Sequence, residues 1–452
     1  MASRVATAPY LLAGVAVAVP WNTVLSVVPY LNVATAAASS PPFAASRSGM
    51  DEGGAAAGLA SLAYQASSFA ATSALVSLGR AGDEAGTTFV VSNAAVLGAL
   101  WCLALAGARG AGVEAAYVAC GAVLGTTAAA YQNALYTRMA VEPDNAAAMQ
   151  AFALGFSAAA TLTTGLAAAS CGGDAFRGAK VSLALGFVAF VAVGAALRAF
   201  AGARAADARD GAARCPPWFG PCRSSSGAGT RPGADEIERP LLGVATRAME
   251  AEAGPGAMEA EARPGAAAAA SRGDGGDPWS ALLAVFLVMA GSLLVIPVVF
   301  SAIQPASSSS PAPCSYTAVL LTLFNAGDMA GRALSHRIAH WSPRSVLALA
   351  LLRTAALFPF FVLAYDDGGA LADQPPRRVG WIPRTDPVAR ALAALHGLLN
   401  GLSFTAGAWL APAQAADDRD RPRLGRLVGF ATALGLSVGS ALGAVVAHVA
   451  AP

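Results

Sequence analysis

A carboxylate and a guanidinium stand four residues apart in a segment that is otherwise apolar. In the stretch LTLFNAGDMAGRAL, Asp328 precedes Arg332 by four residues, and Asn325 lies about one helical turn before Asp328. Residues spaced in this way project from one face of a helix and can contact each other. Because a carboxylate accepts hydrogen bonds and a guanidinium donates them, the pair could hold a neutral polyol such as a ribose.

The cost of these two charges in a lipid environment decides where they must point. On the insertion scale, each costs about 2.5–3.5 kcal/mol at the centre of a membrane helix. Their face of the helix must therefore turn toward the protein interior or toward a watery cavity. Two interpretations follow: an internal ion pair that only fixes the rotation of the helix, or a polar clamp for a solute.

Other hydrogen-bonding residues occur in apolar stretches elsewhere. In VPWNTVLSVVPYL, Trp21 offers an aromatic face and an indole N–H, and Asn22 offers an amide. In AAAYQNALYTRM, Gln132 can both donate and accept, as the edge of a nucleobase requires. A lone Gln in a membrane helix can equally bond to a neighbouring helix.

Two further polar residues are expected to serve other purposes. Arg353 lies near the start of its apolar stretch, and we expect it to snorkel to the cytoplasmic interface. Asn400 is followed by Gly401, and we expect this pair to serve close helix packing.

No combination of catalytic motifs emerges from the sequence. It contains no phosphate-cradling glycine loop and no HExxH. The six cysteines form no CxxC pair. The sequence therefore predicts binding and passage of a solute rather than an enzyme, with no catalytic residue, cofactor or metal.

The composition indicates the environment in which these residues lie. Of the 452 residues, 56% are hydrophobic and only 12% are charged, with a mean hydropathy of +0.54. Soluble domains carry about one quarter charged residues, so this chain is expected to lie in a lipid bilayer. The net charge of +2 argues against a nucleic-acid partner.

Apolar stretches long enough to span a bilayer recur along the chain. A spanning helix needs about 20 predominantly apolar residues. We count eleven such stretches: 8–31, 55–78, 86–107, 113–136, 146–170, 178–201, 279–303, 313–335, 344–365, 388–412 and 425–449. The first is longer than a signal-peptide core, so we expect a retained helix although ATAAASS after it resembles a cleavage site.

These stretches predict an all-α integral membrane protein with a 6+5 arrangement. Residues 1–201 would form a six-helix bundle and residues 278–452 a five-helix bundle. Between them, residues 202–277 are rich in Ala, Gly, Pro, Arg and Glu, and we expect a disordered cytoplasmic linker. Loop arginines favour a cytoplasmic N-terminus, which places the C-terminus outside. On this topology an external disulfide between Cys171 and Cys314 is geometrically allowed.

Two of these stretches, PWNTVLSVVPYL and FNAGDMAGRAL, together resemble the equilibrative nucleoside transporter family. That family typically shows P-W-N in its first helix and F-N-x-x-D-x-x-G-R in its eighth. Further matches are a Gln, a Pro and a second Gln around the fourth and fifth helices, an R-x-x-x-x-x-P in the ninth, and an N-G followed by Pro in the tenth. The matching residues are Pro20, Trp21, Asn22, Gln132, Pro143, Gln150, Phe324, Asn325, Asp328, Gly331, Arg332, Arg353, Pro359, Asn400, Gly401 and Pro412.

The resemblance implies a fold similar to the major facilitator type, with two bundles that rock about a central site. It places Asp328 and Arg332 at the ribose and Gln132 at the base. The substrate-binding residues it implies are Trp21, Asn22, Leu25, Gln132, Asp328 and Arg332, with Gln150, Asn325, Arg353 and Asn400 as structural or gating residues. Asn133 and Ala151 stand where the family often has glycine, which leaves base preference open.

The predicted function is a nucleoside carrier that works by alternating access, with the nucleoside and the lipid bilayer as its partners. No coupling-ion site is evident, but plant and protist members of that family can be proton-coupled, and Asp328 would then be the carboxylate to suspect. A carrier of the same fold for nucleobases or monoamines is the first alternative, and a non-transporting membrane scaffold is the second. The plasma membrane is the expected location, with an organellar membrane as the alternative.

Overall fold

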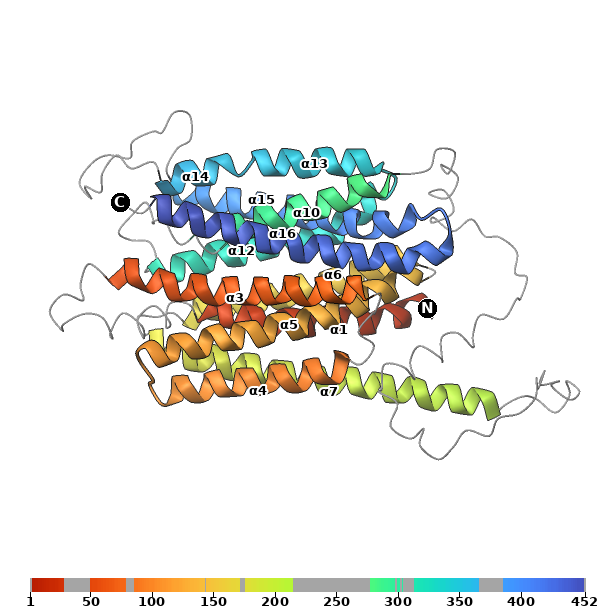
Figure 1. Cartoon of the computed structure of the whole chain (residues 1–452), viewed down its shortest axis with the longest axis horizontal. Coiled ribbons are helices and arrows are strands. Elements are labelled where there is room, and N and C mark those ends of the chain that lie inside the picture. Colours follow the sequence, from red (N-terminus) through yellow and green to blue (C-terminus); the bar gives the residue numbers. More distant parts are fainter. Residues whose placement is uncertain are drawn as a thin grey trace, which may run out of the picture.

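The structure is a computed structural model of the whole chain. The described residues are 2–27, 49–78, 85–142, 144–170, 175–213, 277–296, 299–300, 303, 313–365 and 385–450. Within these ranges every regular element is a helix, as the sequence predicts. The helices run roughly parallel to one long axis and form an elongated bundle (Figure 1).

The helices fall into two sets along the chain. The first set consists of α1 (Ala2–Ser26), α3 (Gly49–Ser77), α4 (Ala85–Leu105), α5 (Ala111–Val141), α6 (Asn145–Ser170) and α7 (Ala175–Ala213). The second set consists of α10 (Pro278–Val295), α12 (Pro313–Leu334), α13 (Pro343–Ala355), α14 (Phe358–Tyr365), α15 (Asp386–Ala413) and α16 (Arg421–Ala450). With α13 and α14 counted together, these helices correspond to the eleven predicted stretches.

Local sequence signals explain several helix ends. Asp277 caps α10 by accepting a hydrogen bond from the Trp279 amide at 3.0 Å, and Pro278 fills the first helical position. The hydrogen bond from the Ser280 hydroxyl lowers the pKa of the Asp277 carboxyl. Ser342 caps α13 in the same way, by accepting from the Ser345 amide at 3.2 Å. The two capped helix starts lie at the same end of the bundle (Figure 1).

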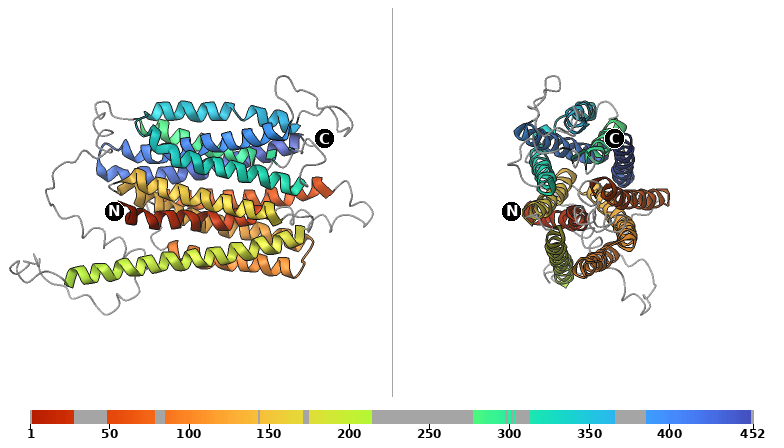
Figure 2. Two further views of the ribbon diagram at one scale, coloured as in Figure 1. Left: turned by 180° about the vertical axis from the view of Figure 1, so that it is seen from behind. Right: turned by 90° about the vertical axis from the view of Figure 1, so that its left-hand side faces the viewer.

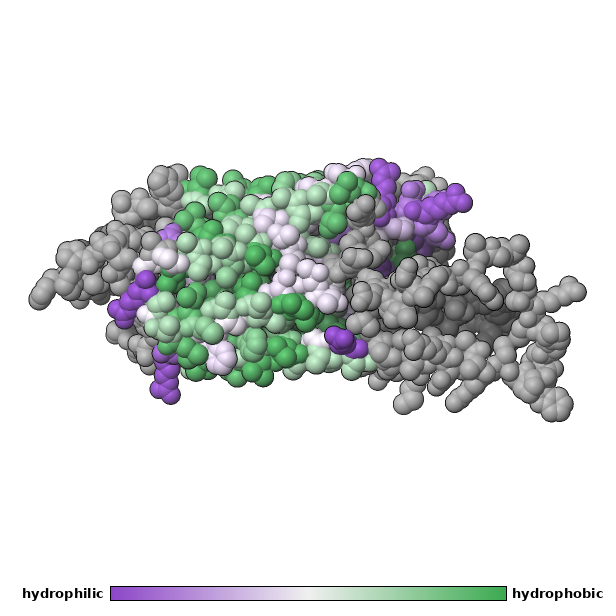
Figure 3. Space-filling model, turned by 60° about the horizontal axis from the view of Figure 1, so that its bottom comes forward, coloured by the Kyte–Doolittle hydropathy of each residue, from purple (hydrophilic) through white to green (hydrophobic). Residues whose placement is uncertain are grey.

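The outer surface of the bundle is suited to lipid. Within the part of the chain that the structure describes, eight helical segments are long and apolar enough to cross a membrane; the long helices α3, α12 and α15 are not among them. Large apolar side chains point outward, such as Leu162 at 68% exposure and Val188 at 61%. Figure 3 shows apolar residues across the middle of the visible face and hydrophilic ones toward its ends.

Both sets of helices pack in the same pairwise order. The first helix packs on the fifth (α1 with α6) and the second on the fourth (α3 with α5). In the second set, α10 packs on α16 and α12 on α15. Glycines allow these close approaches: a Cβ at Gly155 would lie 1.9 Å from the Leu11 carbonyl oxygen, and one at Gly401 would lie 2.0 Å from that of Asp328. Viewed end-on, the two sets lie side by side (Figure 2).

The end of the first set differs from its predicted boundary. We predicted that the sixth span ends at residue 201, but α7 continues as a helix to Ala213. Figure 1 shows α7 projecting beyond its neighbours. The rest of the predicted disordered linker, residues 214–276, lies outside the described residues, as do Pro143 and Cys171 of the sequence predictions.

Candidate functional site: a cavity between the two helix sets

A cavity of about 140 Å³ lies between the two sets of helices. It is large enough to hold several waters. Its described lining comes from four helices of each set: α1, α3, α5 and α6, and α10, α12, α15 and α16. Of the described residues in α4, α7, α13 and α14, none lines it. The cavity is thus enclosed by the helices that meet between the two sets.

The residues predicted to bind a substrate are brought together in this cavity. The described lining includes Trp21, Asn22, Leu25, Gln132, Asp328 and Arg332. Asn325 and Asn400 line it as well, whereas Gln150 and Arg353 do not. Residues more than 300 positions apart in the chain therefore share one chamber.

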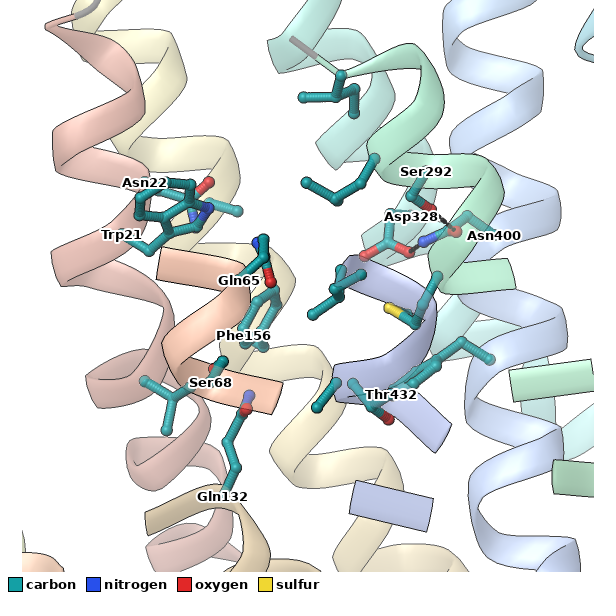
Figure 4. A pocket seen from close by; sticks show the side chains of 18 of the residues that line it. Trp21, Asn22, Gln65, Ser68, Gln132, Phe156, Ser292, Asp328, Asn400 and Thr432 are labelled. Carbon is teal, nitrogen blue, oxygen red and sulfur yellow. Dashed lines mark hydrogen bonds between the residues drawn. The ribbon is translucent and has the colours of Figure 1, made fainter. Parts of the chain in front are cut away.

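One wall combines an aromatic pair with amide and hydroxyl groups. The ring of Trp21 stacks on that of Tyr64, with centroids 4.0 Å apart and an interplanar angle of 18°. Gln65, Ser68 and Gln132 lie on the same side of the cavity, and Asp328 lies on the opposite side (Figure 4). This wall can contact a planar ring and donate or accept hydrogen bonds.

The predicted ion pair forms at the opposite wall. Arg332 Nε donates to Asp328 Oδ2 at 2.7 Å, and both residues are only 3% exposed. Ser157 of α6 donates to the same oxygen, and Asn400 Nδ2 donates to Oδ1 at 2.6 Å. A carboxylate has about four acceptor positions, and these three hydrogen bonds occupy three of them. The pair is thus an internal ion pair that also borders the cavity, and its role as a clamp for a solute stays a prediction.

The guanidinium of Arg332 keeps unused donors. Its Cζ lies 5.5 Å from the ring centroid of Phe156 and 4.9 Å from that of Phe404, so the group is held between two aromatic rings. Among the described residues, only its Nε has a hydrogen-bond acceptor, in Asp328. The N–H groups of its two terminal nitrogens therefore have no acceptor among the described residues.

Arg353 does not snorkel, so that prediction is wrong. Its side chain is fully buried because α13 packs against α10 and α15, whose polar atoms it reaches. Nη1 donates to the Val288 carbonyl at 2.9 Å, and Nη2 donates to Ser292 Oγ at 2.8 Å and lies 3.0 Å from His396 Nε2. Arg353 of α13 thus contacts polar groups of α10 and α15 and connects these three helices.

Asn400 also does more than the predicted packing. It accepts a hydrogen bond from Ser292 Oγ at 2.7 Å and donates to Asp328, which joins α10, α15 and α12 (Figure 4). Through Ser292, the chain of hydrogen bonds extends from Arg353 to Asp328. Gly401 does provide the expected close packing. The network therefore orients the Asp328 carboxylate.

Polar side chains of α6 connect the two sets of helices. Gln150 Nε2 donates to the carbonyls of Arg332 at 3.1 Å and Ala333 at 3.0 Å. Asn325 Nδ2 lies 3.4 Å from Thr164 Oγ1, a weaker contact. Together with Ser157, these residues form a polar seam between α6 and α12.

Several polar residues of the site were not predicted. Ser157 and Ser292 are single small residues in apolar helices, and nothing in their local sequence marks them. By contrast, four buried polar residues of α3 carry a helical spacing of 4, 3 and 4, which is a signal that could have been used. They are Ser61, Gln65, Ser68 and Thr72, of which the last three line the cavity. Among the described residues, no group of three or more His, Cys, Asp or Glu could hold a metal ion.

Comparisons with known proteins identify the fold. No family model matches the chain, and a search of curated proteins finds no match. Among solved structures, the xylose transporter XylE from E. coli, in a partially occluded inward open conformation, gives a TM-score of 0.50 at 10% identity, over 98% of this chain and 95% of that one. The proton:xylose symporter XylE bound to 6-bromo-6-deoxy-D-glucose gives 0.51 at 13% identity, over 96% and 86%. The chain therefore has the all-helical, multi-span membrane fold of the major facilitator superfamily.

Proposed function

We propose that this protein is a secondary transporter that carries nucleosides across a membrane by alternating access. The observation that carries the proposal is the pairing, across one cavity, of a guanidinium with unused donors and a wall of aromatic and amide groups. The likeness to two structures of the transporter XylE, one of them with a bound sugar analogue, supports the transport part. The resemblance to equilibrative nucleoside transporters supports the substrate class.

The two walls suit the two parts of a nucleoside. The terminal N–H groups of Arg332 and the one remaining acceptor position of Asp328 would engage ribose hydroxyls. Trp21 and Tyr64 would pack against the base, and Gln132 would bond to its edge. A free base would forgo the contacts at Arg332, and a free sugar would forgo those at the aromatic pair.

The contact between the two helix sets is compatible with separation. The seam of α6 with α12 relies on neutral donors such as Gln150, and a typical hydrogen bond contributes about 0.5–1.5 kcal/mol net. Such contacts can break and re-form during rocking of one bundle against the other.

Uptake assays test this proposal. Labelled adenosine, uridine, adenine and xylose are offered to transport-deficient cells that express the protein, at two external pH values. We expect saturable uptake of the nucleosides, with adenosine and uridine competing better than adenine. Uptake of adenine or xylose without nucleoside uptake would overturn the assignment, and no flux in reconstituted vesicles would favour a scaffold. A difference between the two pH values would indicate proton coupling.

A variant pair tests the clamp itself. We expect Arg332→Ala to lower nucleoside uptake roughly 100-fold or more, because hydrogen bonds to charged groups contribute about 1.5–3 kcal/mol each. Arg332→Lys keeps the charge but loses the planar fork, so its uptake should stay well below wild type. Arg344→Ala, at an exposed arginine of α13, is the matched control and should transport normally. Normal uptake by Arg332→Ala, at equal abundance in the membrane, would contradict the clamp.

A further inference from the structure

We propose that Gln65, together with Asn133, reads the hydrogen-bonding edge of the base and thereby sets which nucleosides are accepted. This inference rests on the proposed nucleoside transport and adds two residues that the sequence prediction did not assign to the substrate. Both line the cavity, Gln65 from α3 and Asn133 from α5.

The first observation is that both amides are buried without partners. Gln65 and Asn133 are each 1% exposed. Among the described residues, nothing bonds to Gln65 Oε1 or to either side-chain polar atom of Asn133. Burying an unpaired polar group is destabilising, so such residues call for an explanation outside the folded chain itself. A ligand that enters the cavity would provide the missing partners.

The second observation is the position of Gln65. It directly follows Tyr64, whose ring stacks on Trp21, and both Tyr64 and Gln65 line the cavity. The main-chain carbonyl oxygen of Gln65 accepts a hydrogen bond from Ser437 Oγ at 2.9 Å, which fixes this part of α3 against α16. Figure 4 shows the Gln65 side chain on the Trp21 side of the cavity, across from Asp328. A base that packs on the rings while its sugar reaches Arg332 would present its edge to Gln65.

The chemistry of the carboxamide defines the ligand class. A carboxamide offers one acceptor and an adjacent N–H donor, and it can turn over to exchange them. It therefore matches the amino group and neighbouring ring nitrogen of adenine, and equally the N–H and carbonyl edge of uracil or hypoxanthine. Bases with such an edge should be accepted in both the purine and pyrimidine classes. A base without an exocyclic donor or carbonyl should be disfavoured.

Adenosine and purine riboside, which differ only in the 6-amino group, provide the test. For the wild type we expect uptake efficiency to favour adenosine roughly tenfold, as a buried polar site does against an analogue that leaves it unpaired. Gln65→Leu should bring this ratio close to one, chiefly by lowering adenosine uptake. Asn133→Ala should shift the ratio in the same direction.

Thermal stability separates this role from a structural one. Gln65→Leu removes an unpaired buried amide, so the melting temperature in detergent should stay equal or rise. Gln150→Leu is the matched variant: its amide bonds to the carbonyls of Arg332 and Ala333, so its melting temperature should fall. A lower melting temperature for Gln65→Leu with equal loss of both substrates would overturn the inference.

The outcomes distinguish this inference from the proposed function. If the wild type takes up neither nucleoside, nucleoside transport itself fails. If the wild type transports both but the ratio is unchanged in Gln65→Leu and Asn133→Ala, only the reading of the base edge fails.

Discussion

The helices around the cavity and those on the outside of the molecule differ in hydropathy and in burial. The outer helices α4 and α7 qualify easily as membrane spans, yet only 33% and 28% of their spans are buried. The long helices α3, α12 and α15 do not qualify, although they carry Gln65, Asp328 and Asn400 on the cavity wall. Of the eight helices whose described residues line the cavity, these three thus have a weak hydropathy signal, because polar residues are tolerated where neighbours or a cavity satisfy them.

The largest expected effect contrasts two carboxylates. Asp328→Asn leaves the buried Arg332 guanidinium without its countercharge, so we expect a loss of about 3–5 kcal/mol of stability together with loss of uptake. Asp418→Asn breaks the exposed pair with Arg421 and should cost less than about 1 kcal/mol. For each variant, the melting temperature in detergent measures the loss of stability, and uptake per molecule in the membrane measures the loss of transport. Similar losses for the two variants would contradict the comparison.

A pair of glycines gives the next largest contrast. A Cβ at Gly401 would lie 2.0 Å from the Asp328 carbonyl oxygen, so Gly401→Ala must push α12 from α15 and should cost about 1–3 kcal/mol or more. At Gly98 of α4 the nearest atom would be 3.7 Å away. Gly98→Ala should be neutral or stabilising by up to about 1 kcal/mol, because Ala favours the helix. Equal melting temperatures for the two variants would show that α12 and α15 are less tightly packed than described.

The smallest effect concerns an outer helix alone. Ser342→Ala removes the cap of α13 and should lower stability by about 1 kcal/mol. Since α13 does not line the cavity in the described residues, substrate affinity should be unchanged. A changed KM for adenosine, with little change in melting temperature, would contradict the separation of outer and cavity helices.

The site was predictable where a residue conflicts with its own surroundings in the sequence. Asp328 and Arg332 are costly in an apolar stretch, so their inward orientation could be inferred from the sequence alone. The role of Arg353 was predicted wrongly because its position near a helix start allowed snorkelling, whereas its acceptors in α10 lie 61 and 65 residues earlier in the chain. Ser157 bonds to Asp328 across the two helix sets, and no local pattern encodes such a partner.

The fold was predictable for a similar reason, except at one boundary. Long apolar stretches determine the helices because a spanning chain must satisfy its backbone groups internally. The end of α7 was misplaced because charged and glycine residues after 201 indicated a linker, whereas the stretch RAADARDGAA is rich in alanine, the strongest helix former.

The position of Arg332 between two rings has a further consequence. Phe156 belongs to the first helix set and Phe404 to the second, as does Arg332 itself. If the two helix sets separate, Arg332 keeps its contact with Phe404 and loses its contact with Phe156. The affinity for the substrate would then vary over the transport cycle. It would be highest when both rings flank the guanidinium and lowest when the two helix sets are separated on that side.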